Sequence, residues 1–215
     1  MFQKLRLIVL AILVATGFGS FASTALAQTV YSSTPSSANI NNGPGSTYVS
    51  TFTVSTATPI TAIAQRTLAG TTSNQRFFIS NGTTGAVLYL SPVKTFAPDA
   101  GAPTFKRSDD FAAFILQPGT PYVIGMIADV SQAAYYNSNP APAAQNGITN
   151  TGFRIALNRD APVLAGGSSS LYFDMQLFGV LPTPVPTMSE WAMILFGTVL
   201  AGGAALYIQR RRFSA

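Results

Sequence analysis

The feature that most constrains this chain is an uncharged run near its C-terminal end, from Trp191 to Ile208. Its eighteen residues would form a helix about 27 Å long, close to the roughly 30 Å of a hydrocarbon core. The apolar residues keep to no single helical face, and three glycines would weaken a helix in water. The run therefore predicts a transmembrane helix over residues 191–208 rather than a helix buried in a globular core.

The residues that flank this run predict its orientation. Trp191 stands at one end and Tyr207 near the other, and aromatic side chains favour the interface between lipid and water. Arg210, Arg211 and Arg212 follow, and positively charged residues resist transfer across the membrane. Residues 209–215 are thus expected to form a cytoplasmic tail, with the mature chain before the run exported.

A proline-rich segment precedes the run. Residues 181–190 carry Pro182, Pro184 and Pro186, which oppose a helix there and hold each preceding residue in extended geometry. The segment is expected to form a stiff, polyproline-like stalk outside the membrane. Because processing enzymes read extended backbone, this stalk suits an enzyme substrate; the alternative is a spacer that no enzyme reads.

The order of these parts resembles a known C-terminal signal, the IPTL-CTERM protein-sorting domain, which is a variant of the PEP-CTERM signals of Gram-negative bacteria. The residues that carry the resemblance are Val185, Pro186, Thr187, Met188 and Trp191, followed by the hydrophobic run and by Arg210, Arg211 and Arg212. Val185 stands where the family has Ile, Met188 where it has Leu, and Ala192 where it often has Gly.

The resemblance covers only the C-terminal residues, and what it implies concerns sorting. It implies recognition by an exosortase-like enzyme in the membrane. It also implies a chain that is anchored in the inner membrane before processing and then delivered to the cell surface or to an extracellular matrix such as that of a biofilm.

The N-terminal residues 1–27 have the three parts of a secretory signal peptide. A short positive region precedes an uncharged, mostly apolar run over Leu7–Phe18, and Ala25 and Ala27 supply the small side chains that signal peptidase requires. Cleavage is expected after Ala27, which makes Gln28 the first residue of the mature protein. The alternative, an uncleaved anchor helix, is disfavoured because the run is short for a membrane span.

The stretch between these two ends is close to neutral. Residues 28–184 contain seven Lys or Arg and six Asp, a net charge of +1. This balance argues against nucleic-acid binding, which needs a basic patch. The chain has no Cys and no His, which excludes disulfides, thiolate catalysis and Cys-based metal sites and removes the commonest general base.

Residues 28–180 are predicted to form one all-β domain, a β-sandwich of the jelly-roll or Ig-like type. Alternation of apolar and polar residues predicts half-buried strands, and runs that are apolar on both faces predict central strands. Turn signals such as Asn81-Gly82 and Asn146-Gly147 separate the strands. The polar opening of the domain, residues 32–46, is expected to be a flexible N-terminal arm. The alternating segments are 48–55, 153–158 and 171–180, and the apolar runs are 76–80, 86–90, 111–116 and 122–127.

Few residues of this domain suit catalysis. No pair of its six Asp has a spacing that points across a cleft, and Asp109 and Asp110 are expected to be solvated loop charges beside Lys106 and Arg107. The sequence has no phosphate-binding loop and no serine-nucleophile motif. It therefore predicts neither an enzyme nor a bound cofactor. Calcium is the metal that its Asp and Asn side chains would suit best, but no loop has a ligand pattern, so no metal site is assigned.

The combined prediction is a non-enzymatic, exported surface or matrix protein whose partners are the membrane, signal peptidase and an exosortase-like enzyme. Three alternatives stay open. One is a simple membrane-tethered sandwich, and another is a glycoside hydrolase with two Asp within about 10 Å across a cleft. The third is a carbohydrate-binding module that retains extracellular polysaccharide, with the candidate stacking residues Tyr89, Tyr135, Tyr136 and Tyr172.

Overall fold

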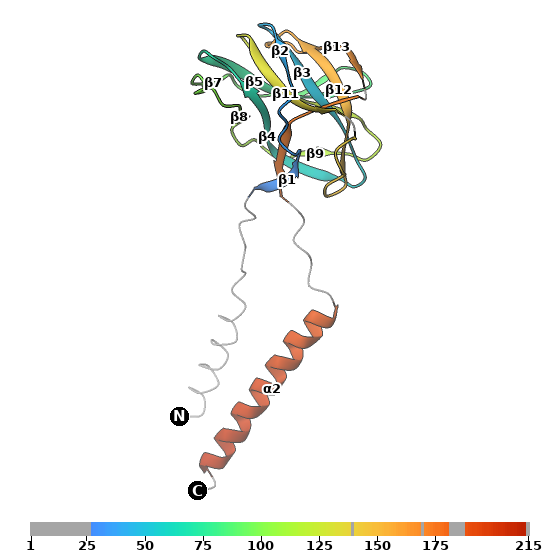
Figure 1. Cartoon of the computed structure of the whole chain (residues 1–215). Helices are drawn as coiled ribbons and strands as arrows, with labels where there is room; N and C mark the ends of the chain where they lie inside the picture. The colour runs from blue at the N-terminus through green and yellow to red at the C-terminus, as the bar shows by residue number, and fades with distance from the viewer. Residues whose placement is uncertain (1–26, 139, 169, 181–187, 214–215) are drawn as a thin grey trace. The chain divides into compact units, whose positions relative to one another are not determined.

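The structure is a computed structural model that describes residues 27–138, 140–168, 170–180 and 188–213 (Figure 1). The chain divides into two compact units, Met1–Leu181 and Pro182–Ala215. Within the described residues, the first unit contains fifteen β-strands and the second contains one helix.

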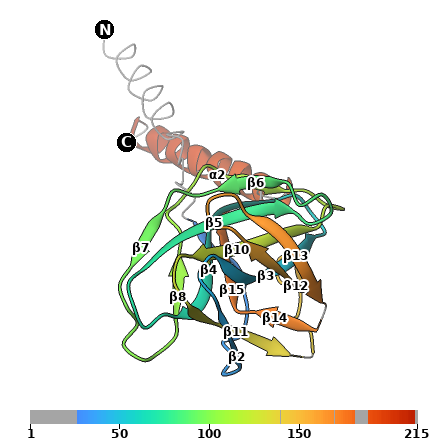
Figure 2. The ribbon, with the colours of Figure 1, turned by 90° about the horizontal axis from the view of Figure 1, so that it is seen from above.

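Seven of the strands in the described ranges form one sheet: β3 (Ser46–Val54), β5 (Ser73–Asn81), β6 (Val87–Leu90), β7 (Lys94–Phe96), β10 (Tyr122–Ala128), β12 (Ile148–Leu157) and β13 (Val163–Ser168). The order across the sheet is β13-β12-β3-β10-β5-β6, and β7 also pairs with β5 (Figure 2). Every pairing in this sheet is antiparallel.

The other eight strands found in the described residues form a second sheet: β1 (Gln28–Ser32), β2 (Asn39–Asn42), β4 (Thr58–Leu68), β8 (Thr104–Arg107), β9 (Phe114–Leu116), β11 (Gln132–Ser138), β14 (Leu171–Phe173) and β15 (Met175–Gly179). The order is β1-β15-β4-β11-β14, with β2 added to β11 and with β8 and β9 added to β4. These pairings are antiparallel as well.

The main core lies between the two sheets and takes side chains from both. Phe52, Phe77 and Ile124 come from the seven-stranded sheet, and Ile63 and Leu177 come from the eight-stranded sheet; all five are fully buried. Two antiparallel sheets that bury alternate side chains against each other form a β-sandwich. The predicted all-β class and the packing of two sheets are therefore confirmed.

The runs that are apolar on both faces fall into two groups. Residues 76–80 and 122–127 lie in β5 and β10, which are central strands, as predicted. Residues 86–90 and 111–116 do not: β6 pairs only with β5, and Leu88 on it is 45% exposed. Strand β9 is three residues long, and its Ile115 is 50% exposed. An apolar run alone does not determine how many neighbours its strand has, so the central placement of these two runs was wrong.

The opening of the domain is also different from the prediction. Residues 32–46 are not a loose arm, because β2 pairs with β11 along its length and β1, just before, pairs with β15. Val30 and Tyr31 on β1 are buried in the main core. The polar composition of the segment suggested disorder, but pairing with strands ninety or more residues away in the sequence orders it.

A buried glutamine joins the two sheets where strand pairing stops. The pairing of β3 with β10 covers only Tyr122–Ile124 on β10. Beyond it, Gln65 from β4 accepts a hydrogen bond from the amide of Met126 (3.1 Å) and donates one to the carbonyl of Tyr48 (2.8 Å). Gly125 leaves space for Gln65 and for Val49 beside it, since a Cβ there would lie 3.0 Å from Gln65 Oε1 and 2.2 Å from Val49 Cγ1.

Among the residues that the structure describes, no helix has both the length and the apolar character that are needed to cross a membrane. A helix does cover residues 191–208, as predicted, because α2 spans Met188–Phe213. The transmembrane assignment of these residues is not confirmed.

Candidate functional site

The C-terminal unit is built on one long helix, α2 (Met188–Phe213). At 1.5 Å per residue, its 26 residues measure about 39 Å. The helix begins two residues after Pro186, the last of three alternating prolines, whose rings oppose a helix interior. From Met188 onward the sequence is rich in Ala, Leu, Ile and Met, which favour a helix, and the helix continues through Gly202 and Gly203.

In its middle, α2 exposes large apolar side chains on all sides. Ile194, Leu195 and Phe196 succeed one another at steps of about 100° around the helix, and each is more than half exposed. Val199, about one turn further, is 68% exposed. The polar residue of this stretch, Thr198, donates its hydroxyl to the carbonyl of Ile194 (3.0 Å), so it presents little polarity outward. A surface of this kind is unfavourable in water and suits an apolar environment.

Part of the predicted sorting motif lies on this helix. Met188 is its first residue and Trp191 lies in its first turn. Val185, Pro186 and Thr187 lie outside the described residues.

The charged residues of α2 stand at opposite ends. Glu190 is in the first turn, and Arg210, Arg211 and Arg212 are in the last turn. A helix carries partial positive charge at its N-terminal end and partial negative charge at its C-terminal end. Both sets of charges therefore stabilise the helix, while the stretch between them is uncharged.

The predicted motif residues all fall within one segment that a family model recognises. Residues 183–212 match the IPTL-CTERM motif. The resemblance seen in the sequence is thus confirmed, and the matched segment lies inside the second compact unit, Pro182–Ala215. A comparison with curated proteins finds no match to this chain.

The match identifies residues 183–212, called the sorting segment below, as the C-terminal sorting signal of an exported, surface-directed protein. A sorting signal works by being recognised, so the match also implies a partner in the processing or sorting machinery of the cell. The sandwich ends before this segment begins, because β15 stops at Gly179.

The two ends of the sandwich meet on neighbouring strands. Gln28, the first residue of β1, pairs with Gly179, the last residue of β15. Ala27 and Gln28 are both exposed, whereas Ala25 lies outside the described residues. The predicted signal-peptide cleavage point, after Ala27, therefore lies at the first residue of an edge strand.

Strand β1 is held along its outer edge by side-chain amides. The amide of Gln145 accepts a hydrogen bond from Ser32 N (2.9 Å) and donates one to Ser32 O (2.7 Å). Asn146 Nδ2 donates to Val30 O (2.8 Å). Asn146 and Gly147 have φ values of 50° and 76°, which a tight turn of this type requires, so the turn predicted at this dipeptide is confirmed.

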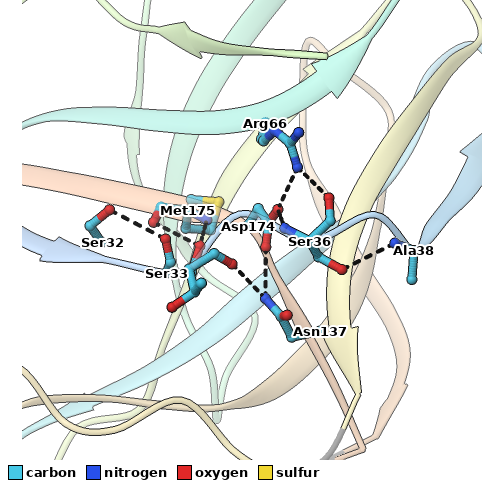
Figure 3. A network of polar contacts seen from close by, with 9 residues as sticks. Ser32, Ser33, Ser36, Ala38, Arg66, Asn137, Asp174 and Met175 are labelled. Atoms are coloured by element: carbon cyan, nitrogen blue, oxygen red, sulfur yellow. Dashed lines mark hydrogen bonds and ion pairs between the residues drawn. The ribbon is translucent and has the colours of Figure 1, made fainter. Parts of the chain in front are cut away.

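A buried polar network joins the opening of the domain to the end of the sandwich (Figure 3). Asp174 stands between β14 and β15, where the chain changes its partner from β11 to β4, and its side chain is fully buried. Its carboxylate accepts hydrogen bonds from Ser36 N (2.8 Å), Arg66 Nη1 (3.2 Å) and Asn137 Nδ2 (3.0 Å). Arg66 also donates to the carbonyl of Ser36.

Burial sets the electrostatics of this network. Burial raises the pKa of Asp174, and it outweighs the hydrogen bonds from Ser36 and Arg66, which act to lower the pKa. The sequence pattern had placed Asp174 on the polar face of an alternating strand. The signal in the sequence was a single acid inside a strongly apolar stretch, because an acid that is buried with such a stretch must be paired and hydrogen-bonded.

The acids of the domain are used in ion pairs. Asp110 is exposed beside Arg107, as predicted, but Lys106 pairs with the buried Asp99 and not with either adjacent Asp. Within the described residues the ion pairs are Asp99–Lys106, Asp109–Lys94, Asp110–Arg107, Asp129–Arg159, Asp160–Arg159, Asp160–Arg76 and Asp174–Arg66. In the part of the chain that the structure describes, no group of three or more acidic residues is placed to hold a metal ion.

The four tyrosines proposed as sugar platforms have different environments. Tyr135 and Tyr172 are buried, with exposed fractions of 8% and 6%, so they are unsuited to stacking on a ligand. Tyr136 packs on the buried Phe173 with ring centroids 5.6 Å apart. Tyr89 differs, because it is half-buried and lines a cavity.

Proposed function

We propose that this protein is a non-enzymatic component of the cell surface or extracellular matrix of a Gram-negative cell, with the sandwich as the delivered domain. The observation that carries the proposal is the match of residues 183–212 to the IPTL-CTERM motif, on a compact unit separate from the sandwich. Residues 1–27 act as the signal peptide, and signal peptidase cleaves after Ala27.

The helix α2 serves as the anchor before processing. Residues 191–208 span the inner membrane, and Arg210, Arg211 and Arg212 stay in the cytoplasm. Two facts support this part of the proposal. The run is uncharged over eighteen residues, and the side chains described in its middle are apolar and exposed on all sides.

An exosortase-like enzyme then recognises Val185, Pro186, Thr187, Met188 and Trp191 and releases the sandwich for transfer to the surface. Pro186 keeps Val185 extended, which is the backbone geometry that processing enzymes bind. The Arg cluster orients the segment so that the motif stands on the outer side of the membrane.

The substitution Pro186→Ala tests this proposal in the native host. It frees the backbone at Val185 and leaves the hydrophobic run and the Arg cluster intact. Full-length, membrane-held protein should accumulate, and the surface fraction on an immunoblot should fall by about tenfold or more. Pro182→Ala is the matched control, because it removes a proline just before the matched segment and should leave sorting unchanged.

Two outcomes decide between sorting and a simple tether. If Pro186→Ala and wild type have equal size and location, no enzyme reads the motif and the protein is only a membrane-tethered sandwich. Deletion of Arg210–Arg212 should disrupt sorting in a different way from Pro186→Ala, because loss of the retaining charges lets the tail cross the membrane. A protease added to intact cells or spheroplasts would then reach an epitope placed at the C-terminal end.

A further inference from the structure

A small cavity lies at one margin of the sandwich, where both sheets contribute to it. Its volume is about 240 Å³, and its lining includes Phe77, Tyr89, Lys94, Asp109, Asp110 and Phe111. Phe77, Tyr89 and Lys94 belong to β5, β6 and β7 of the seven-stranded sheet. The other three lie between β8 and β9, in a segment that runs beside β4 of the eight-stranded sheet.

The segment that carries Asp109, Asp110 and Phe111 is fixed to β4 on both sides. Ser108 N donates to Ile63 O and Phe111 N donates to Thr61 O, each at 2.8 Å. Ser108 Oγ also accepts a hydrogen bond from Ile63 N (3.1 Å). The wall opposite is the antiparallel pairing of β5 with β7 and with β6, the latter interrupted by a bulge between Ile79 and Ser80. Both walls of the cavity are therefore held by backbone hydrogen bonds, as in a preformed binding site.

Aromatic rings form the apolar part of the cavity. Phe77 lines the cavity and is fully buried. Tyr89 and Phe111 approach from opposite sheets, with ring centroids 4.2 Å apart and planes inclined by 31°. Both rings are only partly buried, so ring surface stays open beside the charged rim.

Two exposed carboxylates and an ammonium group form that rim. The side chain of Asp109 is 81% exposed, and its Oδ1 atom forms an ion pair with Lys94 at 2.6 Å. The side chain of Asp110 is 65% exposed, and its Oδ1 atom forms an ion pair with Arg107. Within the described residues, neither Oδ2 atom has a protein partner. Each carboxylate thus keeps one oxygen free to accept hydrogen bonds from a ligand. The two basic side chains offset both acidic charges, so the rim as a whole is close to neutral.

We propose that this cavity binds one ring of a neutral sugar, with the apolar face of the ring against Tyr89 and Phe111 and its hydroxyls on Asp109, Asp110 and Lys94. Carboxylate oxygens accept strong hydrogen bonds from hydroxyls, and an ammonium group donates them. The balanced charge favours a neutral ligand over a charged one. At about 240 Å³ the cavity is smaller than the roughly 300–1,000 Å³ of drug-sized sites, which limits the bound part to a single ring.

The protonation of Tyr89 agrees with this assignment. Burial, and in second place the charge of Asp109, raise the pKa of Tyr89 above its ordinary value. Its hydroxyl is protonated at neutral pH, as that of an unshifted tyrosine also is, and can donate a hydrogen bond to a ligand. The site goes beyond the proposed sorting function and does not rest on it, because binding can be measured on purified protein.

The test uses the full chain in a zwitterionic detergent without a sugar headgroup. Ligand-observed NMR titrations would use the methyl glycosides of glucose, galactose, mannose and N-acetylglucosamine, with methyl glucuronide as the charged probe. At least one neutral glycoside should saturate with a Kd on the order of 1 mM, as expected for one ring. The glucuronide should bind at least about fivefold more weakly, since it brings a third carboxylate next to Asp109 and Asp110.

Variants locate the site. Asp109→Ala and Asp110→Ala should each weaken binding by about tenfold, as expected for loss of a charge-assisted hydrogen bond. Tyr89→Phe, which removes only the hydroxyl, should weaken it by about threefold. Asp160→Ala is the matched control, because Asp160 is 61% exposed and paired with arginine outside the cavity, and it should bind as wild type does. Thermal unfolding of each variant would show that the fold is intact.

Three results would overturn the proposal. The first is failure of every neutral glycoside to saturate below about 100 mM. The second is equal binding by Asp109→Ala, Asp110→Ala and Asp160→Ala. The third is tighter binding of the glucuronide than of the neutral glycosides.

Discussion

The sandwich and the helix α2 contain the same kinds of large apolar side chain in opposite environments. Phe77 on β5 is fully buried, whereas Phe196 on α2 is 67% exposed. Ile124 on β10 is fully buried, and Ile194 on α2 is 51% exposed. The sandwich removes its apolar surface from water by folding, whereas the described part of the second unit, residues 188–213, is α2 alone and has no second element to cover these side chains.

Polar groups show the same contrast. The sandwich contains buried charges, such as Asp174 and Asp99, and each is satisfied by an ion pair and by backbone donors. The middle of α2 has no charge at all, and its Thr198 hydroxyl is turned onto the helix backbone. The sandwich is stabilised by its own contacts, and the membrane role proposed above predicts that α2 is stabilised by a surrounding apolar phase instead. Four predictions, from the largest expected effect to the smallest, test this difference.

The largest effect is expected from deleting matched aromatic rings. Phe77→Ala should lower the free energy of unfolding of the sandwich by about 4 kcal/mol, because it removes a fully buried ring and leaves a cavity. Phe196→Ala should leave that free energy within about 0.5 kcal/mol of wild type. Denaturant titration followed by β-sheet circular dichroism would measure both. Similar losses in the two variants would show that α2 packs on the sandwich, and the comparison would fail.

A second pair of variants replaces an exposed valine by arginine, one in α2 and one in the sandwich. Val199→Arg puts a charge in the middle of the hydrophobic run and should disfavour membrane insertion by about 3 kcal/mol. Val163→Arg alters a valine that is 58% exposed on β13 and should change neither insertion nor folding by more than about 0.5 kcal/mol. Carbonate extraction of membranes measures the difference. Equal extraction of both variants would contradict the membrane role of α2.

The buried network provides a third test, which concerns the sandwich alone. Asp174→Ala should cost about 2 kcal/mol, because it leaves Ser36 N and Arg66 without their acceptor; Arg66 is 17% exposed, so water offsets part of the loss. Arg159→Ala, which breaks the partly exposed ion pairs of Arg159 with Asp129 and Asp160, should cost about 1 kcal/mol or less. Urea unfolding at pH 7 compares the two. Equal costs would mean that the network adds nothing beyond a surface pair.

The pH dependence of this cost has a definite sign. The folded-state pKa of Asp174 lies above its ordinary value of 3.8. Its contribution to stability is therefore full below pH 3.8 and falls as the pH rises through the folded pKa. The cost of Asp174→Ala should accordingly be greater at pH 4 than at pH 7. Asp99 has the opposite sign: burial raises its pKa, but hydrogen bonds from Lys106 and Ala69 outweigh burial and lower it, so its contribution is lost on acidification below 3.8.

The smallest effect is expected at the edge strand β1. Gln145→Ala removes both hydrogen bonds to Ser32 and should cost about 1 kcal/mol. The loss should be local, so amide hydrogen exchange should accelerate in β1 and stay unchanged in β10. Uniform acceleration in both strands would show that β1 does not open separately. Gln117→Ala is a suitable control, since the side chain of Gln117 is exposed on a loop.

Some features of this protein were predictable because they depend only on the residues of one short stretch of the chain. The turn at Asn146-Gly147 follows from the backbone freedom of those two residues. The sorting segment is a linear motif, and its residues were recognisable without any fold. The prediction of central strands at residues 76–80 and 122–127 was correct, because their apolar residues extend along both faces.

Other features were not predictable, because they depend on which segments meet. Leu88 and Phe78 sit in similar apolar runs, yet β6 has one neighbour and β5 has three, so only Phe78 is buried. Tyr89 could not be separated from Tyr135, Tyr136 and Tyr172 by sequence. Only the approach of the segment after β8 places Asp109, Asp110 and Phe111 beside it.

By itself, the sequence determined the all-β character of residues 28–180, the position of the sorting segment and the helix that it contains. These depend on local backbone preference, on the period of apolar residues and on charge along the chain. The tertiary structure decided that residues 32–46 are ordered by strand pairing, that Asp174 is buried, and which residues line the cavity at Tyr89. Each of these arises from antiparallel pairing between segments far apart in the chain, and burial and hydrogen bonding are set by those partners rather than by the residue's neighbours in sequence.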